Sequence, residues 1–229
     1  YFLTMPAWCG ERLVWTGNAG DKLWSSPGNW DPEQVPAFGD AVTVADYAST
    51  IMVTQSTAQL ASLVLSGTTL SLTNWTTQLS ADIVFIGSGG LVTCAGPYND
   101  TSDGAGGYAN ASRVWIVCSN LTIAVGGSVD VSGRGFAAYN ASSWYGKGYG
   151  PSAGSGRICG AGHGGCAVQK LMNNSATGPY GSIEAPVTPG SAGGSPMSDL
   201  GGNGGGVVGI EADGTVAVHG SVLANGVGG

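Results

Sequence analysis

This sequence has few charged residues. Asp, Glu, Lys and Arg make up only 9% of the 229 residues, whereas soluble domains carry about 25% charged residues. The seven Lys and Arg residues are scattered along a chain of net charge −7, so they form no basic stripe that could neutralise a phosphate backbone. The composition therefore excludes nucleic acid as a partner.

Long apolar runs are also missing. No run approaches the ~20 residues that a membrane-spanning helix needs, and the first residues lack the basic and then apolar layout of a signal peptide. The chain does not begin with Met, and it ends inside an apolar and glycine-rich stretch with no polar cap. We expect no membrane span, and we expect a mature or partial segment of a longer protein.

Residues typical of catalytic sites are equally few. His163 and His219 are the only histidines, and neither belongs to a recognisable pattern of nucleophile and base. Gly160-x-Gly162-x-x-Gly165 matches a dinucleotide fingerprint in its letters. However, it lacks a clear preceding strand, a following helix and an acidic residue about twenty positions on. A nucleotide cofactor is therefore not expected.

Two sets of side chains could hold a metal or act on sugars. Cys159, His163 and Cys166 carry the donor atoms that zinc prefers, but a structural site needs a fourth ligand, so a disulfide and a hydrogen-bonded, buried imidazole are favoured. Carboxylates in turns could serve as acid and base or hold calcium, with Arg113 and Arg134 as the nearest basic side chains. These carboxylates are Asp100, Asp103, Asp130, Glu211 and Asp213. We interpret them as solvated turn acids, and we expect no catalytic, cofactor-binding or metal-binding residues.

Glycine, in contrast, supplies 42 positions. It also occupies the centre of a short sequence motif, here called the glycine-centred phrase, that occurs three times. Alternate residues of a strand lie on one face, and glycine turns a corner at positive φ without a Cβ clash. Stacked copies bury an apolar stripe that one copy cannot bury, as in a β-solenoid. We therefore predict an all-β parallel β-helix, with a β-sandwich as the main alternative. The copies are Ile83-x-Phe85-x-x-x-Gly89-x-Leu91-x-Thr93, Leu121-x-Ile123-x-x-x-Gly127-x-Val129-x-Val131 and Val208-x-Ile210-x-x-x-Gly214-x-Val216-x-Val218.

The pattern divides the chain into four parts. We expect a Trp- and Pro-rich N-terminal cap at 1–40, β-helix coils at 41–133, a glycine-rich layer or loop at 134–205, and a further coil at 206–229 that continues in a longer protein. Short apolar runs bounded by turn residues predict the strands. These lie at 41–44, 50–54, 60–65, 69–72, 82–86, 91–93, 114–117, 121–124, 128–131 and 206–210.

The first forty residues contain Trp15-Thr-Gly, then Trp24-Ser-Ser-Pro-Gly-Asn-Trp30-Asp-Pro, then Val35-Pro-Ala-Phe-Gly-Asp40. This run resembles the N-terminal lead-in of large secreted parallel β-helix proteins, including bacterial adhesin passengers and related eukaryotic surface proteins. The resemblance implies a cap, in which aromatic rings cover the open end of the apolar axis. A Trp platform that stacks on sugar rings is the alternative.

A second resemblance lies in the glycine-rich half. Gly160-Ala-Gly-His-Gly-Gly165, Gly201-Gly-Asn-Gly-Gly-Gly206 and the closing 214–226 segment resemble the "GHGG" module of very large extracellular β-helix proteins, which include adhesins and flagellar-hair (mastigoneme) proteins. Cys166 stands where that module has a further glycine. The resemblance implies no catalytic residues. It implies close backbone packing, with polyproline-II-like passes on the solenoid.

Five cysteines in a chain with few charges indicate an oxidising compartment. Cys94 and Cys118 each adjoin a predicted strand and lie 24 positions apart, about one coil, so we expect a disulfide between them if their Cα atoms come close enough. Cys159 and Cys166 flank one glycine-rich loop and form the second expected pair. Cys9 remains, which suggests a bond to another subunit or to a missing part of the chain, or a free thiol.

Acceptor triplets for N-glycosylation are more frequent than chance. Six of the eleven asparagines begin Asn-x-Ser/Thr without proline, where chance gives about two. The excess implies a eukaryotic secretory history and glycans that hydrate a surface with few charges; a simple crowding of Asn, Ser and Thr into turns is the alternative. The triplets begin at Asn74, Asn99, Asn110, Asn120, Asn140 and Asn173.

Together these features predict a non-catalytic, secreted, cell-surface glycoprotein. It would be a β-helical shaft or filament subunit of the mastigoneme kind, or an adhesin, whose partners are further copies of itself or other subunits of an extracellular assembly. The alternative is a polysaccharide-binding or polysaccharide-degrading β-helix protein. That class would line a groove with carboxylates and exposed aromatic side chains such as Trp115, Trp144 and Tyr145.

Overall fold

The computed structural model describes residues 10–99, 111–138, 145–146, 148–154, 161–163, 179–182, 184–185, 187–196 and 201–228. Within these ranges the chain is all-β, and the only helix is η1, a 3-10 turn at Pro27–Asn29. The all-β prediction is therefore confirmed. In the described part of the chain, no helix is long and apolar enough to cross a membrane.

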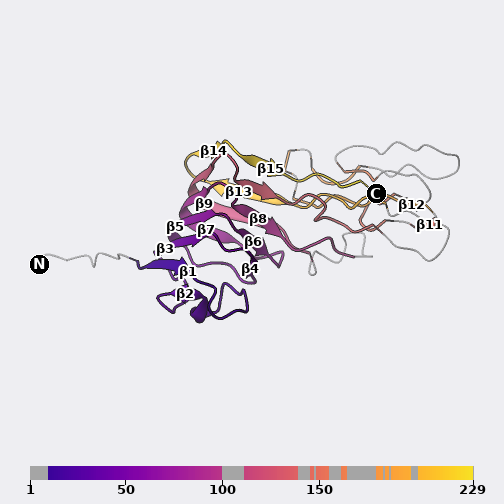
Figure 1. The fold of residues 1–229 in the computed structure, drawn as a ribbon. Coiled ribbons are helices and arrows are strands. Elements are labelled where there is room, and N and C mark those ends of the chain that lie inside the picture. The colour runs from indigo at the N-terminus through magenta and orange to yellow at the C-terminus, as the bar shows by residue number, and fades with distance from the viewer. Residues whose placement is uncertain are drawn as a thin grey trace, which may run out of the picture.

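Two sheets hold nearly all the strands (Figure 1). The larger contains β1 (Arg12–Trp15), β2 (Trp30–Asp31), β3 (Ala41–Ala45), β5 (Leu60–Ser66), β7 (Leu79–Ile86), β9 (Val114–Ile123), β13 (Val208–Ala212) and β14 (Val216–Val218). The smaller contains β4 (Thr50–Val53), β6 (Thr69–Leu72), β8 (Leu91–Cys94), β10 (Ser128–Asp130) and β15 (Ser221–Leu223). A separate antiparallel pair joins β11 (Tyr145–Gly146) to β12 (Ser195–Pro196). All neighbours in the two main sheets are parallel, except β1 and β2.

The chain passes back and forth between the two main sheets. β4 of the smaller sheet follows β3, and β5 then returns to lie beside β3; the same alternation continues through β10. Ser62 pairs with Ala41 on one side and with Ile83 on the other, each 21 residues away. Ile83 pairs in turn with Asn120, 37 residues away. One passage therefore takes 21 residues where the connections are short, and a longer segment is inserted between β8 and β9.

The predicted strands between residues 41 and 131 all exist. The structure joins the two expected at 114–117 and 121–124 into the single strand β9, and it begins β7 at Leu79 rather than at Asp82. It also adds β1, which the sequence analysis did not predict. Strand position was therefore readable from the apolar alternation and the turn residues, while strand length was not.

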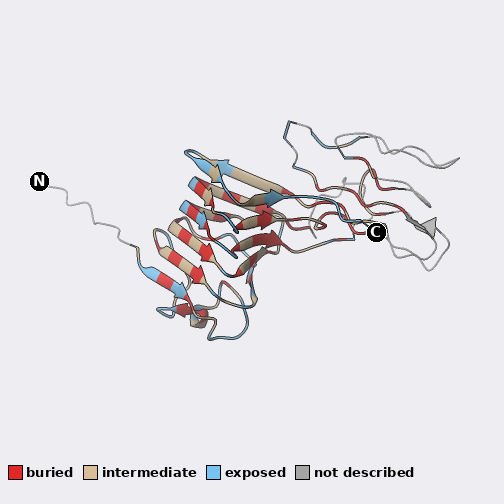
Figure 2. Ribbon diagram, turned by 45° about the horizontal axis from the view of Figure 1, so that its top comes forward, coloured by how far each residue is buried: buried red, intermediate tan, exposed pale blue. Residues whose placement is uncertain are grey.

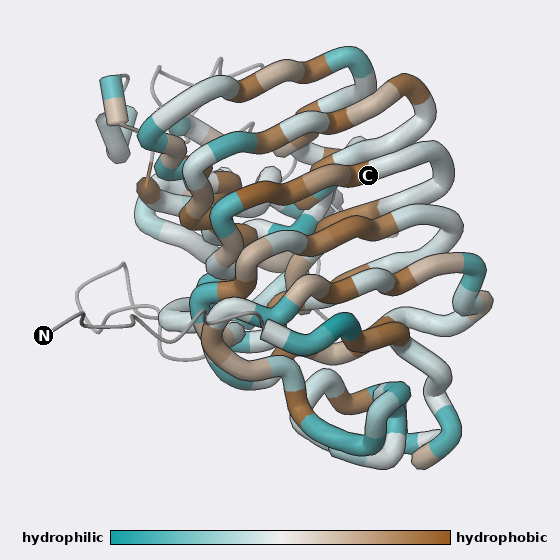
Figure 3. The backbone as a smooth tube through the Cα atoms, turned by 90° about the vertical axis from the view of Figure 1, so that its left-hand side faces the viewer, coloured by the Kyte–Doolittle hydropathy of each residue, from teal (hydrophilic) through white to brown (hydrophobic). Residues whose placement is uncertain are grey.

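The main hydrophobic core lies between the two sheets. Alternate side chains point inward, so Leu63 and Leu65 of β5 and Leu70 and Leu72 of β6 are fully buried. Figure 2 shows the buried positions repeating from strand to strand, and Figure 3 shows hydrophobic positions lying over one another in successive passes. Each pass therefore buries the apolar stripe of its neighbour, which supplies the main stabilisation of such a stack.

Three strands of the larger sheet have a corner at which two successive residues face outward; in β5 it lies at Ala61 and Ser62. Asp82 and Ile83 form this corner in β7, and Ser119 and Asn120 form it in β9. One face of a straight strand takes every second residue, so two successive outward residues mean that the strand turns there. Asn120 therefore lies at a turning point of its strand.

The glycine-centred phrase has a different register from the predicted one. The sequence predicted Ile83 and Phe85 on the core stripe, but their side chains are 53% and 38% exposed, and Val84 and Ile86 are fully buried instead. In the structure Val84 pairs with Leu121, one position away from the predicted alignment. A slip of one residue exchanges the two faces of a strand. The prediction was wrong here because both faces of β7 carry apolar residues, so alternation alone could not choose between them.

The third copy of the phrase does not cross between the sheets. Its two halves, β13 and β14, both pair with β9. Between them residues 213–215 oppose only Ser119 and Asn120, so the chain bulges. The Gly214 N–H donates to the Ser119 carbonyl oxygen at 2.8 Å, and the Thr215 N–H donates to Asn120 Oδ1 at 3.0 Å. Gly214 is therefore a bulge residue beside the corner of β9, and the two halves of this copy stay in one sheet.

The Trp-rich segment covers one end of the stack. Trp24 and Trp30 are 4% and 1% exposed and belong to the main core. The Trp30 ring meets the rings of Trp15 and Trp24 edge-on at 4.9 and 4.7 Å, and its indole N–H donates to the Trp24 carbonyl oxygen at 2.9 Å. Rings buried to this degree cannot stack on a sugar, so the platform alternative does not hold for these three residues. These rings therefore close the core beside β1 and β2, at one edge of the larger sheet.

A glycine-rich bundle lies beside the strands, which we define by residues 131–138, 190–193 and 201–206. Its segments bond to one another through the backbone but are not regular strands. N–H groups of 133–137 donate to carbonyl oxygens in four different segments: those of Asn225, Gly204, Gly190 and Tyr98, at 2.9, 2.8, 3.0 and 3.0 Å. A strand in a sheet has at most two neighbours, so this arrangement is a bundle of extended passes.

Close backbone contact explains why this bundle contains so much glycine. A Cβ atom on Gly204 would lie 1.7 Å from the Gly190 carbonyl oxygen, and one on Gly135 would lie 2.3 Å from the Gly205 carbonyl oxygen. Its largest buried side chain is Phe136, which packs against Tyr98 at a ring separation of 4.8 Å. The bundle is thus held by backbone hydrogen bonds and only a small apolar cluster.

Candidate functional site

The last strands of the stack leave core-facing side chains uncovered. Val216 and Val218 of β14 are 45% and 46% exposed, although they pair with Leu121 and Ile123, which are fully buried. The same contrast holds in the smaller sheet, where Val222 is 39% exposed beside the buried Val129. Among the described residues, no strand pairs with the outer edges of β13, β14 and β15. We call this surface the uncovered end and define it by Val216, Val218 and Val222.

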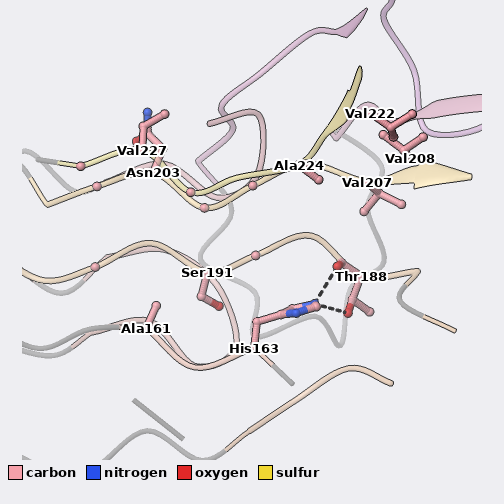
Figure 4. A pocket seen from close by; sticks show the side chains of 18 residues that line it. Ala161, His163, Thr188, Ser191, Asn203, Val207, Val208, Val222, Ala224 and Val227 are labelled. Carbon is pink, nitrogen blue, oxygen red and sulfur yellow. Dashed lines mark hydrogen bonds between the residues drawn. The ribbon is translucent and has the colours of Figure 1, made fainter. Parts of the chain in front are cut away.

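A cavity of about 630 Å³ adjoins the uncovered end (Figure 4). One wall comes from segments 202–208 and 222–228 and includes Val208 and Val222. The opposite wall carries Ala161, His163, Thr188 and Ser191. The first wall is largely apolar and glycine-rich, so the cavity suits an extended backbone with small side chains better than a charged ligand.

His163 holds the opposite wall of the cavity in place. Its Nε2 lies 2.9 Å from the Thr188 carbonyl oxygen, which can only accept, so this nitrogen carries the hydrogen and donates. Its ring also meets the Tyr180 ring edge-on at 4.8 Å. The Tyr180 hydroxyl donates to the Pro189 carbonyl oxygen and accepts from Ser191 Oγ at 2.9 Å. These contacts organise loops. The imidazole is hydrogen-bonded, as predicted, but it is exposed and not buried as the sequence analysis expected.

A cationic and aromatic cluster lies on the outer side of the larger sheet. The Arg113 guanidinium carbon is 3.9 Å from the Trp115 ring centroid and 4.9 Å from that of Trp75, and Arg113 Nε donates to the Trp75 carbonyl oxygen at 2.7 Å. The Trp115 indole N–H donates to Glu211 Oε1 at 3.0 Å. Partial burial lowers the pKa of Arg113, and the charge of Glu211 opposes that shift. Trp115 therefore contacts Arg113 with one ring face and Glu211 with its indole N–H.

Of the candidate catalytic carboxylates, the structure describes Asp130, Glu211 and Asp213. Asp130 Oδ1 accepts the Ser132 N–H at 2.8 Å, and Glu211 faces the Trp115 indole. Arg134 Nη1 donates to the Gly96 carbonyl oxygen at 2.9 Å. Within the described ranges, no three His, Cys, Asp or Glu side chains gather where they could hold a metal ion. Asp100, Asp103, Cys159, Cys166 and Trp144 lie outside the described residues.

The expected disulfide between Cys94 and Cys118 is not formed in the structure, where both are buried free thiols. Cys94 ends β8 in the smaller sheet, whereas Cys118 lies in β9 of the larger sheet. The residue stacked on Cys118 in β7 is Ala81, 37 positions away. The prediction failed because it took 24 residues as one passage, while the inserted segment lengthens this passage. Cys9 and the second expected pair, Cys159 and Cys166, lie outside the described residues.

Burial dominates the acid–base behaviour of these thiols. It raises the pKa of Cys94 from 9.0 to about 12, against an opposing effect of Arg134. Burial also raises the pKa of Cys118, and the charge of Asp213 adds to that shift. A thiolate is the reactive form of cysteine, so both side chains are poor nucleophiles in the folded chain.

Three of the six candidate glycosylation sites fall among the described residues. Asn74, Asn99 and Asn120 are all exposed. Asn74 Nδ2 donates to the Thr54 carbonyl oxygen at 2.6 Å, and Asn120 Oδ1 accepts the Thr215 N–H. Asn110, Asn140 and Asn173 lie outside the described residues.

Comparisons of the chain with protein-family models, with curated proteins and with solved structures found no match. The functional argument therefore depends on the geometry. The sequence analysis missed the contact of Arg113 with Trp75, 38 residues away. No local pattern could have revealed that contact, because it depends on the length of the segment inserted before β9.

Proposed function

We propose that this chain is a parallel β-helical segment of a non-catalytic extracellular structural glycoprotein. It would form part of a shaft or filament of the mastigoneme kind, or of a cell-surface adhesin. The observation that carries the proposal is the asymmetry of the stack: tryptophan rings cover one end, while Val216, Val218 and Val222 remain exposed at the other.

The alternation of the chain between two parallel sheets supports the β-helical part of the proposal. A 21-residue passage repeats from Ala41 to Ser62 and from Ser62 to Ile83, and successive passes pair in parallel. A stack of this kind contacts mainly its own neighbours and lengthens by the addition of passes. It is therefore suited to act as a stiff spacer, with little need for a cleft or for catalytic groups.

The uncovered end supports the assembly part of the proposal. Edge strands with free N–H and C=O groups are templates for another strand. Here the edges also carry core-facing Val216 and Val218, which a further pass in the same register would bury. The occupant we propose is a further strand-forming pass, supplied by the longer protein that the sequence analysis expects or by another subunit of the assembly. The cavity beside Val208 and Val222 would admit its backbone.

Electron microscopy of the native material tests this proposal. Regular filaments or shafts would support it, and dispersed single particles would count against it. Val218→Asp should abolish end-to-end contacts without unfolding the chain, because its side chain already contacts water. Val125→Asp is the matched control, since Val125 is 76% exposed and lies on the turn between β9 and β10, outside the three valines that define the uncovered end. If the two variants assemble equally well, the uncovered end is not the contact surface.

A second candidate function, polysaccharide binding, is favoured by the cluster of Arg113, Trp115 and Glu211. A partly exposed indole beside a cation and a carboxylate is a combination that sugar-binding surfaces use. Titration of the chain with neutral and acidic polysaccharides tests it, with Trp115→Ala as the variant. Binding that Trp115→Ala removes would favour this function, and an absence of binding would exclude it for this cluster.

A further inference from the structure

Two apolar side chains on the outer face of the larger sheet lie beside a glycosylation triplet. Ile83 and Phe85 of β7 are 53% and 38% exposed. They pair with Asn120 and Thr122 of β9, the first and third residues of the triplet Asn120-Leu-Thr122. Neighbouring strands lie about 4.8 Å apart, so these four side chains form one compact surface. Leu121, between the two polar residues, points inward and is fully buried.

The amide of Asn120 is held in a way that leaves room for a sugar. Its Oδ1 accepts the Thr215 N–H at 3.0 Å, which fixes the bulge between β13 and β14. Its Nδ2 makes no hydrogen bond to any described residue, and the side chain is exposed. An N-linked sugar is attached to Nδ2 and leaves Oδ1 as an acceptor. The bulge and the glycan are therefore compatible at this position.

We propose that Asn120 is an N-glycosylation site and that the innermost sugars of its glycan cover Ile83 and Phe85. The inference rests on the proposed extracellular function, because the sugar comes from the secretory pathway. In the transfer, the bond from the sugar C1 to a lipid-diphosphate donor breaks and a C1–Nδ2 bond forms. The lipid diphosphate leaves, and the transferring enzyme takes one Nδ2 proton. Covering Ile83 and Phe85 in this way removes apolar surface from water.

The two other described triplets differ from this one. At Asn74 the nitrogen that would carry the sugar already donates to the Thr54 carbonyl oxygen at 2.6 Å. Asn99 is exposed but belongs to no strand. Only at Asn120, among the described triplets, does the acceptor pair across a sheet with an exposed apolar side chain. A glycan there would serve the fold as well as solubility.

Site occupancy is the first test. The chain is expressed in a eukaryotic secretory host, and intact glycopeptides are measured by mass spectrometry in the wild type, in Thr122→Val and in Thr122→Ser. We expect glycan mass at Asn120 in the wild type and in Thr122→Ser, which keeps the triplet, and its complete loss in Thr122→Val. An empty Asn120 beside an occupied Asn74 or Asn99 overturns this inference and leaves the proposed function standing. If all triplets are empty, the glycoprotein part of the proposed function fails as well.

Packing of the glycan is the second test. An endoglycosidase that leaves one sugar is applied to the folded protein, and the change in unfolding temperature gives the contribution of the outer glycan to stability. The difference in unfolding temperature between Thr122→Val and Thr122→Ser gives the contribution of the whole glycan. We expect Thr122→Val to unfold about 2–4 °C below Thr122→Ser for a chain of this size. The difference should vanish in the background Ile83→Thr with Phe85→Thr, which removes the covered side chains. If the unfolding-temperature difference is equal in both backgrounds, the glycan does not pack on Ile83 and Phe85, because its effect is then independent of these two residues.

Discussion

The strand stack and the glycine-rich bundle lie side by side but are held together by different means. In the stack, side chains such as Leu63 and Leu70 fill the space between two sheets and are fully buried. In the bundle, backbones approach so closely that a Cβ on Gly204 would lie 1.7 Å from the Gly190 carbonyl oxygen. Loss of side-chain atoms should therefore damage the stack, whereas addition of side-chain atoms should damage the bundle.

The largest expected effect is in the stack, at its capped end. Trp30→Ala should cost about 3–5 kcal/mol in the free energy of unfolding, because it empties a fully enclosed site between Trp15 and Trp24. Urea denaturation measures the change. Phe38→Ala, at a 66% exposed aromatic residue of the same segment, is the control and should change stability by no more than about 0.5 kcal/mol. Equal effects of the two variants would contradict the cap.

The register of β7 offers the next test. Ile86→Ala should cost about 2–5 kcal/mol, since Ile86 is fully buried. Phe85→Ala, in the unglycosylated chain, should stay within about 0.5 kcal/mol, since its ring is on the outer face. Urea denaturation of the two variants measures both changes and shows which face of β7 is buried. A larger loss in Phe85→Ala would restore the register that the sequence predicted.

In the bundle, the damaging change is an added methyl group. Gly204→Ala should destabilise the bundle locally by about 1–3 kcal/mol, because the new Cβ collides with the Gly190 carbonyl oxygen. Hydrogen exchange should quicken at the Phe136 and Gly190 amides, which donate within the bundle, and should stay slow in the stack. Gly228→Ala is the control, because a Cβ there meets no atom within 4 Å. Uniform quickening across both regions would mean that stack and bundle unfold as one unit.

The last expected effect is a pH dependence of the stack, which is absent at neutral pH and begins only above pH 9. Burial raises the pKa of the Cys94 thiol from 9.0 to about 12, so the folded chain holds this proton more tightly than the unfolded chain. Its contribution to stability is complete below pH 9 and is lost as the pH rises from 9 towards 12. Denaturation midpoints of the wild type and of Cys94→Ala should therefore converge over this range. Midpoints that fall in parallel would exclude Cys94 as the cause.

Much of the stack could be predicted from the sequence, because short apolar alternations bounded by turn residues are local signals. The strands β3 to β10 were expected close to their observed positions. Register was not predictable in the same way. The outer face of β7 carries Ile83 and Phe85, so the sequence offered two apolar faces and gave no local reason to choose Val84 and Ile86.

Long-range pairs were harder to predict, since they depend on segment lengths that no local pattern reveals. Cys94 and Cys118 were expected to pair on the assumption of a uniform passage, but the segment inserted before β9 places them in different sheets as free thiols. Arg113 reaches the Trp75 ring across that same insertion. The high glycine content predicted close backbone contact, but it did not indicate which segments would contact one another.

The sequence by itself determined the all-β class, the positions of most strands, the glycine-rich character of the bundle and the triplets that can accept a glycan. Each of these follows from residue type and spacing over a few positions. Only the tertiary structure decided which face of β7 is buried, that Gly214 forms a bulge beside Asn120, and that Val216 and Val218 remain uncovered. These outcomes depend on which passes lie next to one another, and that is set by the summed burial and hydrogen bonding of the whole stack.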